Sequence, residues 1–550
     1  MREQSISTAT DSSVDDLCRS YLDLKYHFDP ASGSAAGLVS EDGRLGRFDA
    51  ESMREHLSAL RSVTGALEEL DTSDVQREID RTALLGEIRS AMYRWQHEQP
   101  HVRNPSFWLS HLFQSLYSLL TRTGADLASR APAVVARLEA APGFLDACRA
   151  TIESPASVFV DTALSMLGGG GELIAQVVAV FGQTAPDLRE QLQQSGEAAL
   201  KALVGFGAAL RNEIEPNPNP TAFAVGEAQF TRTLQHEHAL SAGPAELWRY
   251  GVRLQEEVTG QIVELAGRLS SKPWRQLLEE LREDSPEPDD LLGVYRSEVE
   301  RARSFLSEHQ LIDLPDGPVE VVPTPEYLRT LVPFAAYSPP PVYLPDRTGR
   351  FYVTAPDPAL PREVTAEQRK AHARFGIPVL VAHEVYPGHH LQLLTMEDLG
   401  SEVRRHLWSP LMVEGWALYA ERLMQEAGYY QSDETHLFQL VTLLWRAIRV
   451  VLDVGLHVRG MTPAEATDYL VEHMPIERRN AEAEVRRYCG MPTYQLCYAV
   501  GLRELLSLRE AYQDTRGSAF SLRAFHSELM AYGGMPVALA RWGMDLAESP

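Results

Sequence analysis

Residues 378–394 read PVLVAHEVYPGHHLQLL. An apolar run leads to the pair His383-Glu384, and a Pro-Gly break then separates this pair from two adjacent histidines, His389 and His390. Imidazole and carboxylate groups are common Zn²⁺ ligands, and a Glu beside a ligating His is often the general base that activates a metal-bound water. This stretch therefore predicts the core of a metal-dependent hydrolase.

The common zinc-binding string His-Glu-x-x-His is absent, because Pro387 occupies the place of its second His. Pro387 has no N–H and clashes with the carbonyl of residue 383, so the helix should kink or break there. In an unbroken helix, residue 390 would share the phase of His383 but lie about 10.5 Å further along the axis. Phase favours His390 as the second ligand and axial distance favours His389. Both stay open, with a slight preference for His390.

A third ligand is expected from a neighbouring helix. Residues 409–423, SPLMVEGWALYAERL, carry Glu414 among apolar side chains, where an unpaired carboxylate would be costly to bury. A metal ion or an arginine could compensate this charge, and we predict the metal. Glu421 lies seven residues later, near the same helical phase, and is predicted to support the ligands.

Two further helical stretches carry polar residues that could serve the site. In residues 439–457, Arg446, Arg449, Asp453 and His457 recur at spacings of three, four and four, so they share one helical face. This face is either an internal ion-pair ladder, or it orients the ligands and binds a substrate carboxylate through Arg.

The last such stretch is residues 491–510, MPTYQLCYAVGLRELLSLRE. Tyr494 and Tyr498 lie four residues apart on one helical face. A Tyr hydroxyl can donate to the oxyanion of a tetrahedral intermediate. Simple packing is the alternative role for either ring.

Most of the remaining chain has the apolar spacing of helices, and the fold is predicted to be mainly α. Short strands are expected at residues 319–322 and 350–354, forming a small β-ribbon near residues 315–355. This ribbon either holds an extended peptide at its edge or simply packs on helices. The glycine run 168–171 is predicted to be a flexible turn, because it lacks the Lys-Ser/Thr of a phosphate-binding loop.

Local signals suggest domain limits and helix starts. The proline-rich stretch 215–223 is a linker. We predict a disordered tail at 1–14, an N-terminal helical region at 15–214, and a helical metal-site region at 224–550. The two helical regions are expected to be lobes of one compact unit. Ser409-Pro410 and Thr462-Pro463 each place a capping residue before Pro, and Thr365-x-x-Gln368 reads as a capping box.

Composition limits the partners. The 550 residues carry a net charge of −25, which argues against nucleic-acid binding. There is neither an apolar signal segment nor a run of about 18 apolar residues, so we expect no membrane span. The four cysteines are scattered, which suggests a reducing compartment and a cytoplasmic location. A homodimer is compatible with these features of the sequence.

Four segments in order, HEVYPGHHLQ, EGWALYAE, LWRAIRVVLDVGLH and MPTYQLCYAVG, resemble the bacterial DUF885 family, which is usually placed with the gluzincin-type zinc-peptidase clan. The resemblance implies a large helical metallopeptidase-like fold with a cleft. It implies His383, Glu414 and one of the two adjacent histidines as ligands, Glu384 as base and Tyr498 as oxyanion donor. One departure is Ala499, where such proteins often carry Lys, and we expect this to alter the charge that anchors a substrate.

We therefore expect a hydrolase that cleaves a peptide or amide bond in a small substrate with one divalent metal, Zn²⁺ being the first choice. The alternative is another metal enzyme, such as a lyase, a decarboxylase or an Fe²⁺-dependent oxidative enzyme, acting on a small biosynthetic intermediate. A catalytically inactive binding protein is the third hypothesis. The intact set of His383, Glu384 and Glu414 argues against it.

Overall fold

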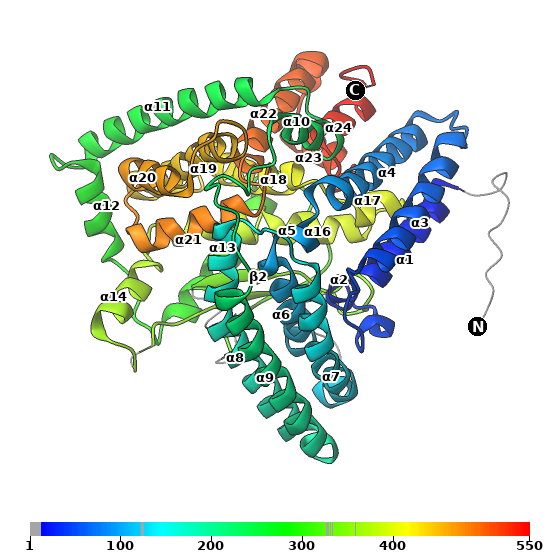
Figure 1. Ribbon diagram of the computed structural model, residues 1–550. Coiled ribbons are helices and arrows are strands. Elements are labelled where there is room, and N and C mark those ends of the chain that lie inside the picture. Colours follow the sequence, from blue (N-terminus) through cyan, green and yellow to red (C-terminus); the bar gives the residue numbers. More distant parts are fainter. Residues whose placement is uncertain are drawn as a thin grey trace. The chain divides into compact units, whose positions relative to one another are not determined.

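The structure is a computed structural model that describes residues 13–122, 126–325, 329, 332, 334–357 and 359–549. Helices dominate these residues and the strands form one small sheet, so the predicted mainly α fold is confirmed (Figure 1). The chain divides into two compact units: unit 1 comprises residues 1–224 and 340–346, and unit 2 comprises residues 225–339 and 347–550. Most of the predicted tail, 1–12, lies outside the described residues, whereas Ser13 and Val14 already form the cap and first residue of a helix.

Helices make up most of the described residues of unit 1. Its longest helices pack side by side, with α8 against α6 and α9, and α9 also against α7. The helices are α1 (Val14–Phe28), α2 (Pro30–Ala35), α3 (Ala50–Glu69), α4 (Val75–Tyr93), α5 (Pro100–Arg103), α6 (Pro105–Thr121), α7 (Leu127–Thr151), α8 (Ser157–Thr184) and α9 (Arg189–Asn212).

The glycine run at 168–171 is not a turn, and that prediction is wrong. All four glycines lie inside α8. A Cβ atom on Gly170 would collide with the ring of Phe113 in α6, so glycine lets the two helices approach closely. The run is therefore a packing feature of a continuous helix.

Helix α8 also departs from the expectation that no segment could span a membrane. By length and composition alone, with a mean hydropathy of 1.5, it qualifies as a candidate span. The core helix of a soluble protein passes the same test, and only 28% of the apolar window in α8 is buried. The helix also carries the exposed residues Asp161 and Glu172, so this is weak evidence for a membrane.

Unit 2 contains the remaining helices and the sheet. Helix α11 lies along α19, and α18 packs closely against α22. The helices are α10 (Glu227–His236), α11 (Pro244–Leu269), α12 (Trp274–Arg282), α13 (Leu291–Glu308), α14 (Arg362–Lys370), α15 (Ile377–Glu384), α16 (His389–Glu397), α17 (Glu402–His406), α18 (Pro410–Glu426), α19 (Asp433–Val458), α20 (Pro463–His473), α21 (Arg478–Cys489), α22 (Cys497–Arg516), α23 (Leu522–Met530) and α24 (Val537–Gly543).

Two of the three predicted helix starts are confirmed. Ser409 and Thr462 are the N-cap residues of α18 and α20, each followed by Pro, and Thr462 forms a full capping box. The third is wrong, because α14 starts at Arg362 after the cap Pro361, which leaves Thr365 inside the helix. There the Thr365 hydroxyl bonds to the carbonyl of Asp357 at 2.9 Å.

The sheet contains both predicted strands and a third. Strand β1 (Val319–Pro323) pairs in parallel with the central strand β3 (Gly349–Val353), and β2 (Ala335–Ser338) pairs antiparallel with its other edge. The register joins Val321 to Phe351 and Tyr337 to Phe351. Phe351 is buried on the sheet and packs edge-on against Tyr295 of α13. The sheet is thereby held against the helices of unit 2.

Candidate metal centre

The candidate centre is built on a break between two short helices. Helix α15 ends at Glu384 and α16 begins at His389. A Cβ atom on Gly388 would collide with the carbonyl of His383, so only glycine allows the chain to fold back this closely. The indole N–H of Trp416, in α18, donates to the carbonyl of Pro387 at 2.8 Å and holds the break in place.

The fold-back brings His389, rather than His390, to His383. One ligand atom from each of His383, His389 and Glu414 lies within 4.8 Å of the other two. Nε2 of His389 is 3.5 Å from Oε2 of Glu414. The rings of the two histidines meet edge-on, with centroids 5.0 Å apart and planes at 87°.

His390 faces the sheet instead, which corrects the slight preference that phase had given it. Its Nδ1 lies 2.9 Å from the hydroxyl of Tyr337 in β2, and burial lowers its pKa to about 4. The phase argument assumed a continuous helix. The break at Gly388 resets the phase, so the shorter axial distance to His389 becomes the deciding factor.

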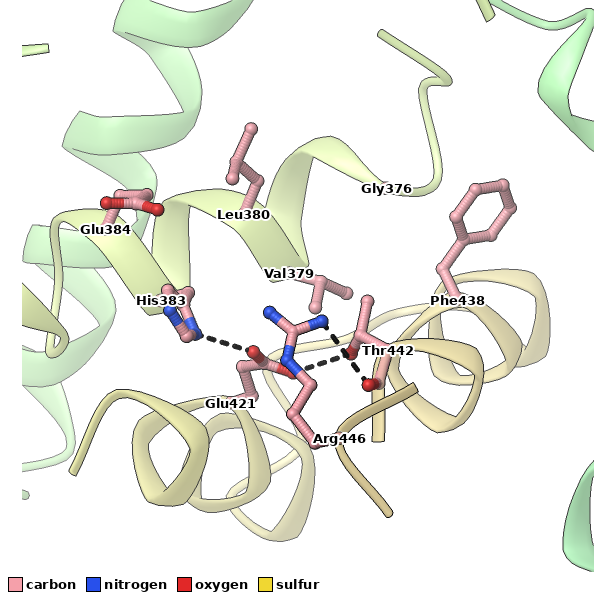
Figure 2. A pocket seen from close by; sticks show the side chains of 9 residues that line it. All are labelled: Gly376, Val379, Leu380, His383, Glu384, Glu421, Phe438, Thr442 and Arg446. Carbon is pink, nitrogen blue, oxygen red and sulfur yellow. Dashed lines mark hydrogen bonds and ion pairs between the residues drawn. The ribbon is translucent and has the colours of Figure 1, made fainter. Parts of the chain in front are cut away.

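Glu421 holds one of the three candidate ligands. Its Oε1 is 2.8 Å from Nδ1 of His383, and its Oε2 accepts a hydrogen bond of 2.9 Å from Thr442 in α19 (Figure 2). Glu421 is 1% exposed. The contact directs the other ring nitrogen of His383, Nε2, away from Glu421, as a carboxylate behind a metal-binding His does.

Two tyrosines hold Glu414. The hydroxyls of Tyr494 and Tyr498 both donate to its Oε1, at 2.5 and 3.1 Å, which leaves Oε2 on the side of His389. The spacing of four places Tyr494 and Tyr498 on one helical face, but it does not predict that both hydroxyls hold Glu414. In this geometry Tyr498 contacts a candidate ligand, and its predicted role as oxyanion donor would require its hydroxyl to leave that carboxylate.

Electrostatics favour an ionised Glu414. Burial is the largest single effect, and alone it would lower the pKa of His389 and raise that of Glu414, but the hydrogen bonds and charges around each group together outweigh it. The pKa of His389 is raised and that of Glu414 falls to about 2. Glu414 is thus a carboxylate at neutral pH, which is the form that a metal ligand needs.

Glu384, the predicted general base, is the last residue of α15. It lines a pocket of about 110 Å³ together with His383, Glu421 and Arg446, and Figure 2 shows these side chains around the end of α15. Within the described part of the chain, its carboxylate makes neither a hydrogen bond nor an ion pair. A free carboxylate beside the candidate ligands can exchange protons with a bound water or substrate.

The polar face of α19 divides between the pocket and the protein interior. Arg446 lines the pocket. Arg449 donates to the hydroxyl of Tyr488 at 3.0 Å and pairs with Glu484. Among the described residues, neither arginine forms an ion pair with Asp453 of the same face: Arg446 bonds within α19, to the carbonyl of Thr442, and Arg449 bonds to α21.

The other two residues of that face support the backbone. Asp453 accepts hydrogen bonds from the N–H groups of Thr493 and Leu496, at 3.1 and 3.0 Å, and so holds the turn that precedes α22 and carries Tyr494. Burial raises the pKa of Asp453 to about 7, against the effect of these N–H groups. Nε2 of His457 lies 3.0 Å from the carbonyl of Tyr488.

The donor set fits a zinc ion. Two imidazoles and one carboxylate are a usual zinc set, with a fourth position left for water or substrate. All three residues are largely buried, and the carboxylate is ionised. His383 has the carboxylate partner that such ligands usually have, whereas Nδ1 of His389 has no hydrogen-bond partner among the described residues.

Comparison with known proteins gives the family. A family model described as "Bacterial protein of unknown function (DUF885)" matches residues 30–544. The chain belongs to the DUF885 family. No curated protein matches it.

Solved structures similar to this DUF885 protein share its fold. One is "a putative lipoprotein of unknown function from Shewanella oneidensis", 22% identical, with a TM-score of 0.79 over 97% of this chain and 100% of that one. Another is "the putative lipoprotein from Colwellia psychrerythraea", 19% identical, with a TM-score of 0.82 over 97% and 99%. At these identities the likeness supports the fold alone.

Proposed function

We propose that this DUF885 protein is a metal-dependent hydrolase that cleaves a peptide or amide bond in a small substrate, as gluzincin-type zinc peptidases do. The observation that carries the proposal is the convergence of His383, His389 and Glu414 near the carboxylate of Glu384, which forms no hydrogen bond or ion pair with another described residue. Together these residues offer a metal site and a base, which are the two requirements of metal-assisted hydrolysis.

Each residue of the centre would have a distinct role. His383, His389 and Glu414 would hold the ion, which when bound supplies Lewis acidity and lowers the pKa of a water molecule. Glu384 takes a proton from the attacking water and delivers it to the leaving nitrogen. Glu421 keeps His383 in position, and Tyr494 and Tyr498 keep Glu414 in position.

The test combines metal analysis with a substitution of the base. We expect about one zinc ion per chain in the purified protein and hydrolysis of some members of a dipeptide and amide panel. Glu384→Gln should retain the metal and lose activity about 10²–10⁴-fold, because only proton transfer is removed. Exposed Glu363→Gln is the control and should keep full activity.

Other outcomes of this test are equally informative. A protein without stoichiometric metal, or a fully active Glu384→Gln variant, would refute the proposed mechanism. Bound iron together with O₂-dependent turnover would instead favour an oxidative enzyme, since two histidines and one carboxylate also suit Fe²⁺.

The location of the protein is part of the proposal. A cytoplasmic location agrees with the four cysteines, all of which are buried and outside any disulfide. The descriptions of the two similar structures as lipoproteins point the other way. Fractionation of cells that produce the full-length protein decides between the two locations.

A further inference from the structure

Among the described residues that line the pocket beside the candidate centre, Arg446 is the one arginine. It projects from α19 toward α15, and the same pocket is lined by His383, Glu384 and Glu421 (Figure 2). The guanidinium carbon also lies 5.7 Å from the ring centroid of Tyr498, whose hydroxyl contacts Glu414. Arg446 therefore borders both the pocket and Tyr498, one of the residues that hold the candidate ligands.

The guanidinium of Arg446 has no acidic partner in the part of the chain that the structure describes. Its one hydrogen bond runs from Nη1 to the carbonyl of Thr442 at 3.3 Å, and its Nε is buried without a partner. The oxygens of Glu421, in the same pocket, are already bonded to His383 and Thr442. Arg449, one turn further along α19, shows the contrast, because it has both Glu484 and Tyr488 as partners.

An unpaired arginine in a pocket is unusual, because removing a charge from water without a counter-ion costs free energy. The face of Tyr498 supplies part of the compensation through a cation–π contact. Apart from the bond to Thr442, its N–H groups have no hydrogen-bond acceptor among the described residues. A guanidinium matches a carboxylate particularly well, because its planar fork can donate two parallel hydrogen bonds.

We propose that Arg446 binds a carboxylate of the substrate, so that the enzyme acts on compounds with a free carboxylate close to the scissile amide. The inference rests on the proposed hydrolase function. In the reaction, water adds to the amide carbonyl, the C–N bond breaks, and the amine leaves with the proton carried by Glu384. The carboxylate bound by Arg446 stays unchanged and orients the substrate.

The pocket volume of about 110 Å³ suits a small group rather than a long chain. The carboxylate could be the C-terminal group of a short peptide, or the side chain of an acidic residue. Both kinds of carboxylate would form the same hydrogen bonds with Arg446, and the experiment below distinguishes between them.

The experiment measures binding without turnover. Zinc-loaded Glu384→Gln protein is titrated calorimetrically with three N-acetyl dipeptides: Ala-Ala with a free C-terminus, Ala-Ala amide, and Ala-Glu amide. We expect at least one of the two acids to bind about tenfold or more tightly than Ala-Ala amide. Adding Arg446→Gln should abolish that preference, and Arg446→Lys should restore part of it.

The control variant is Arg422→Gln, an arginine on the outside of α18 that pairs with Glu426 and should leave the preference unchanged. Zinc content is measured in every variant. If Arg446→Gln lowers zinc affinity and leaves the preference for acids intact, Arg446 serves only as a counter-charge and the inference is wrong. Equal binding of all three peptides also overturns it.

Failure of the inference and failure of the proposed function are distinguishable. Arg446-dependent binding of an acid by a protein that hydrolyses no member of the panel supports the carboxylate site and refutes the hydrolase. Hydrolysis of free acids and amides at equal rates, unaffected by Arg446→Gln, supports the hydrolase and refutes the carboxylate site.

Discussion

A substitution of Glu421 tests whether this residue fixes the orientation of the His383 ring. Glu421→Ala removes the acceptor 2.8 Å from Nδ1 of His383 and leaves that ring free to turn. We expect metal affinity to fall about 10–100-fold, the usual effect of losing such a partner. Competition with a chromophoric chelator measures the affinity. Glu426→Ala, at the exposed end of the same helix, is the control, and an unchanged affinity in Glu421→Ala would contradict the assignment.

Glu397, the last residue of α16, should make stability depend on pH. Burial and the neighbouring Asp398 raise its pKa from 4.5 to about 7, although Arg347 and Arg405 act in the opposite direction. Between these two pKa values the folded state binds more protons than the unfolded state, so stability falls as pH rises from 4.5 to 7.

The fall expected from Glu397 is about 1 kcal/mol, because partial exposure of the side chain reduces the value that the full shift would give. Urea unfolding at pH 5 and pH 7.5 measures it. The Glu397→Gln variant should not show this fall in the free energy of unfolding between the two pH values, while the exposed Glu363→Gln variant should still show it. If the free energy of unfolding changes equally with pH in the unsubstituted protein and in both variants, the prediction for Glu397 is wrong.

At the scale of elements, the contact between α18 and α22 sets the distance from Tyr498 to Glu414. A Cβ atom on Gly501 would collide with the carbonyl of Leu411 and would lie 2.7 Å from Cα of Gly415. Gly501→Ala should therefore push the helices apart and destabilise the protein by about 1–3 kcal/mol. It should also weaken metal binding, because Tyr498 moves with α22.

Chemical denaturation and metal titration of Gly501→Ala test this prediction. The matched control is Gly260→Ala in α11, where a Cβ atom would meet nothing within 4 Å. That change should stabilise the protein by up to about 1 kcal/mol, since alanine is the better helix former. Equal stability of the two variants would mean that the α18–α22 contact tolerates a methyl group.

At the scale of the whole molecule, every candidate ligand belongs to unit 2. Removing the metal with a chelator should therefore increase hydrogen exchange in α15, α16 and α18. Exchange in the helices of unit 1 should stay unchanged. A ligand present at 1,000 times its Kd stabilises the state that binds it by about 4 kcal/mol, which is easily detected. Mass spectrometry of exchange before and after chelation measures the effect, and loss of protection across both units would contradict it.

Local sequence signals were sufficient for much of the fold. Apolar spacing predicted the helices, and Ser409-Pro410 and Thr462-Pro463 marked helix starts correctly, because capping depends on a few neighbouring residues. Local signals failed at the glycine run of α8, because Gly170 is required by close contact with Phe113 on another helix. Strand β2 was also missed, because its four residues are too short to show a clear alternation.

For the candidate centre, the sequence by itself determined the chemical inventory: His383, Glu384, Glu414 and two adjacent histidines around a Pro-Gly break. Only the tertiary structure decided that His389 turns toward His383, because that choice depends on the close fold-back at Gly388 and on the bond from Trp416. It also decided which polar residues of α19 have partners. The partners of Arg449 and Asp453 lie in α21 and in the turn before α22. Contacts between such distant segments are set by packing, which no local pattern encodes.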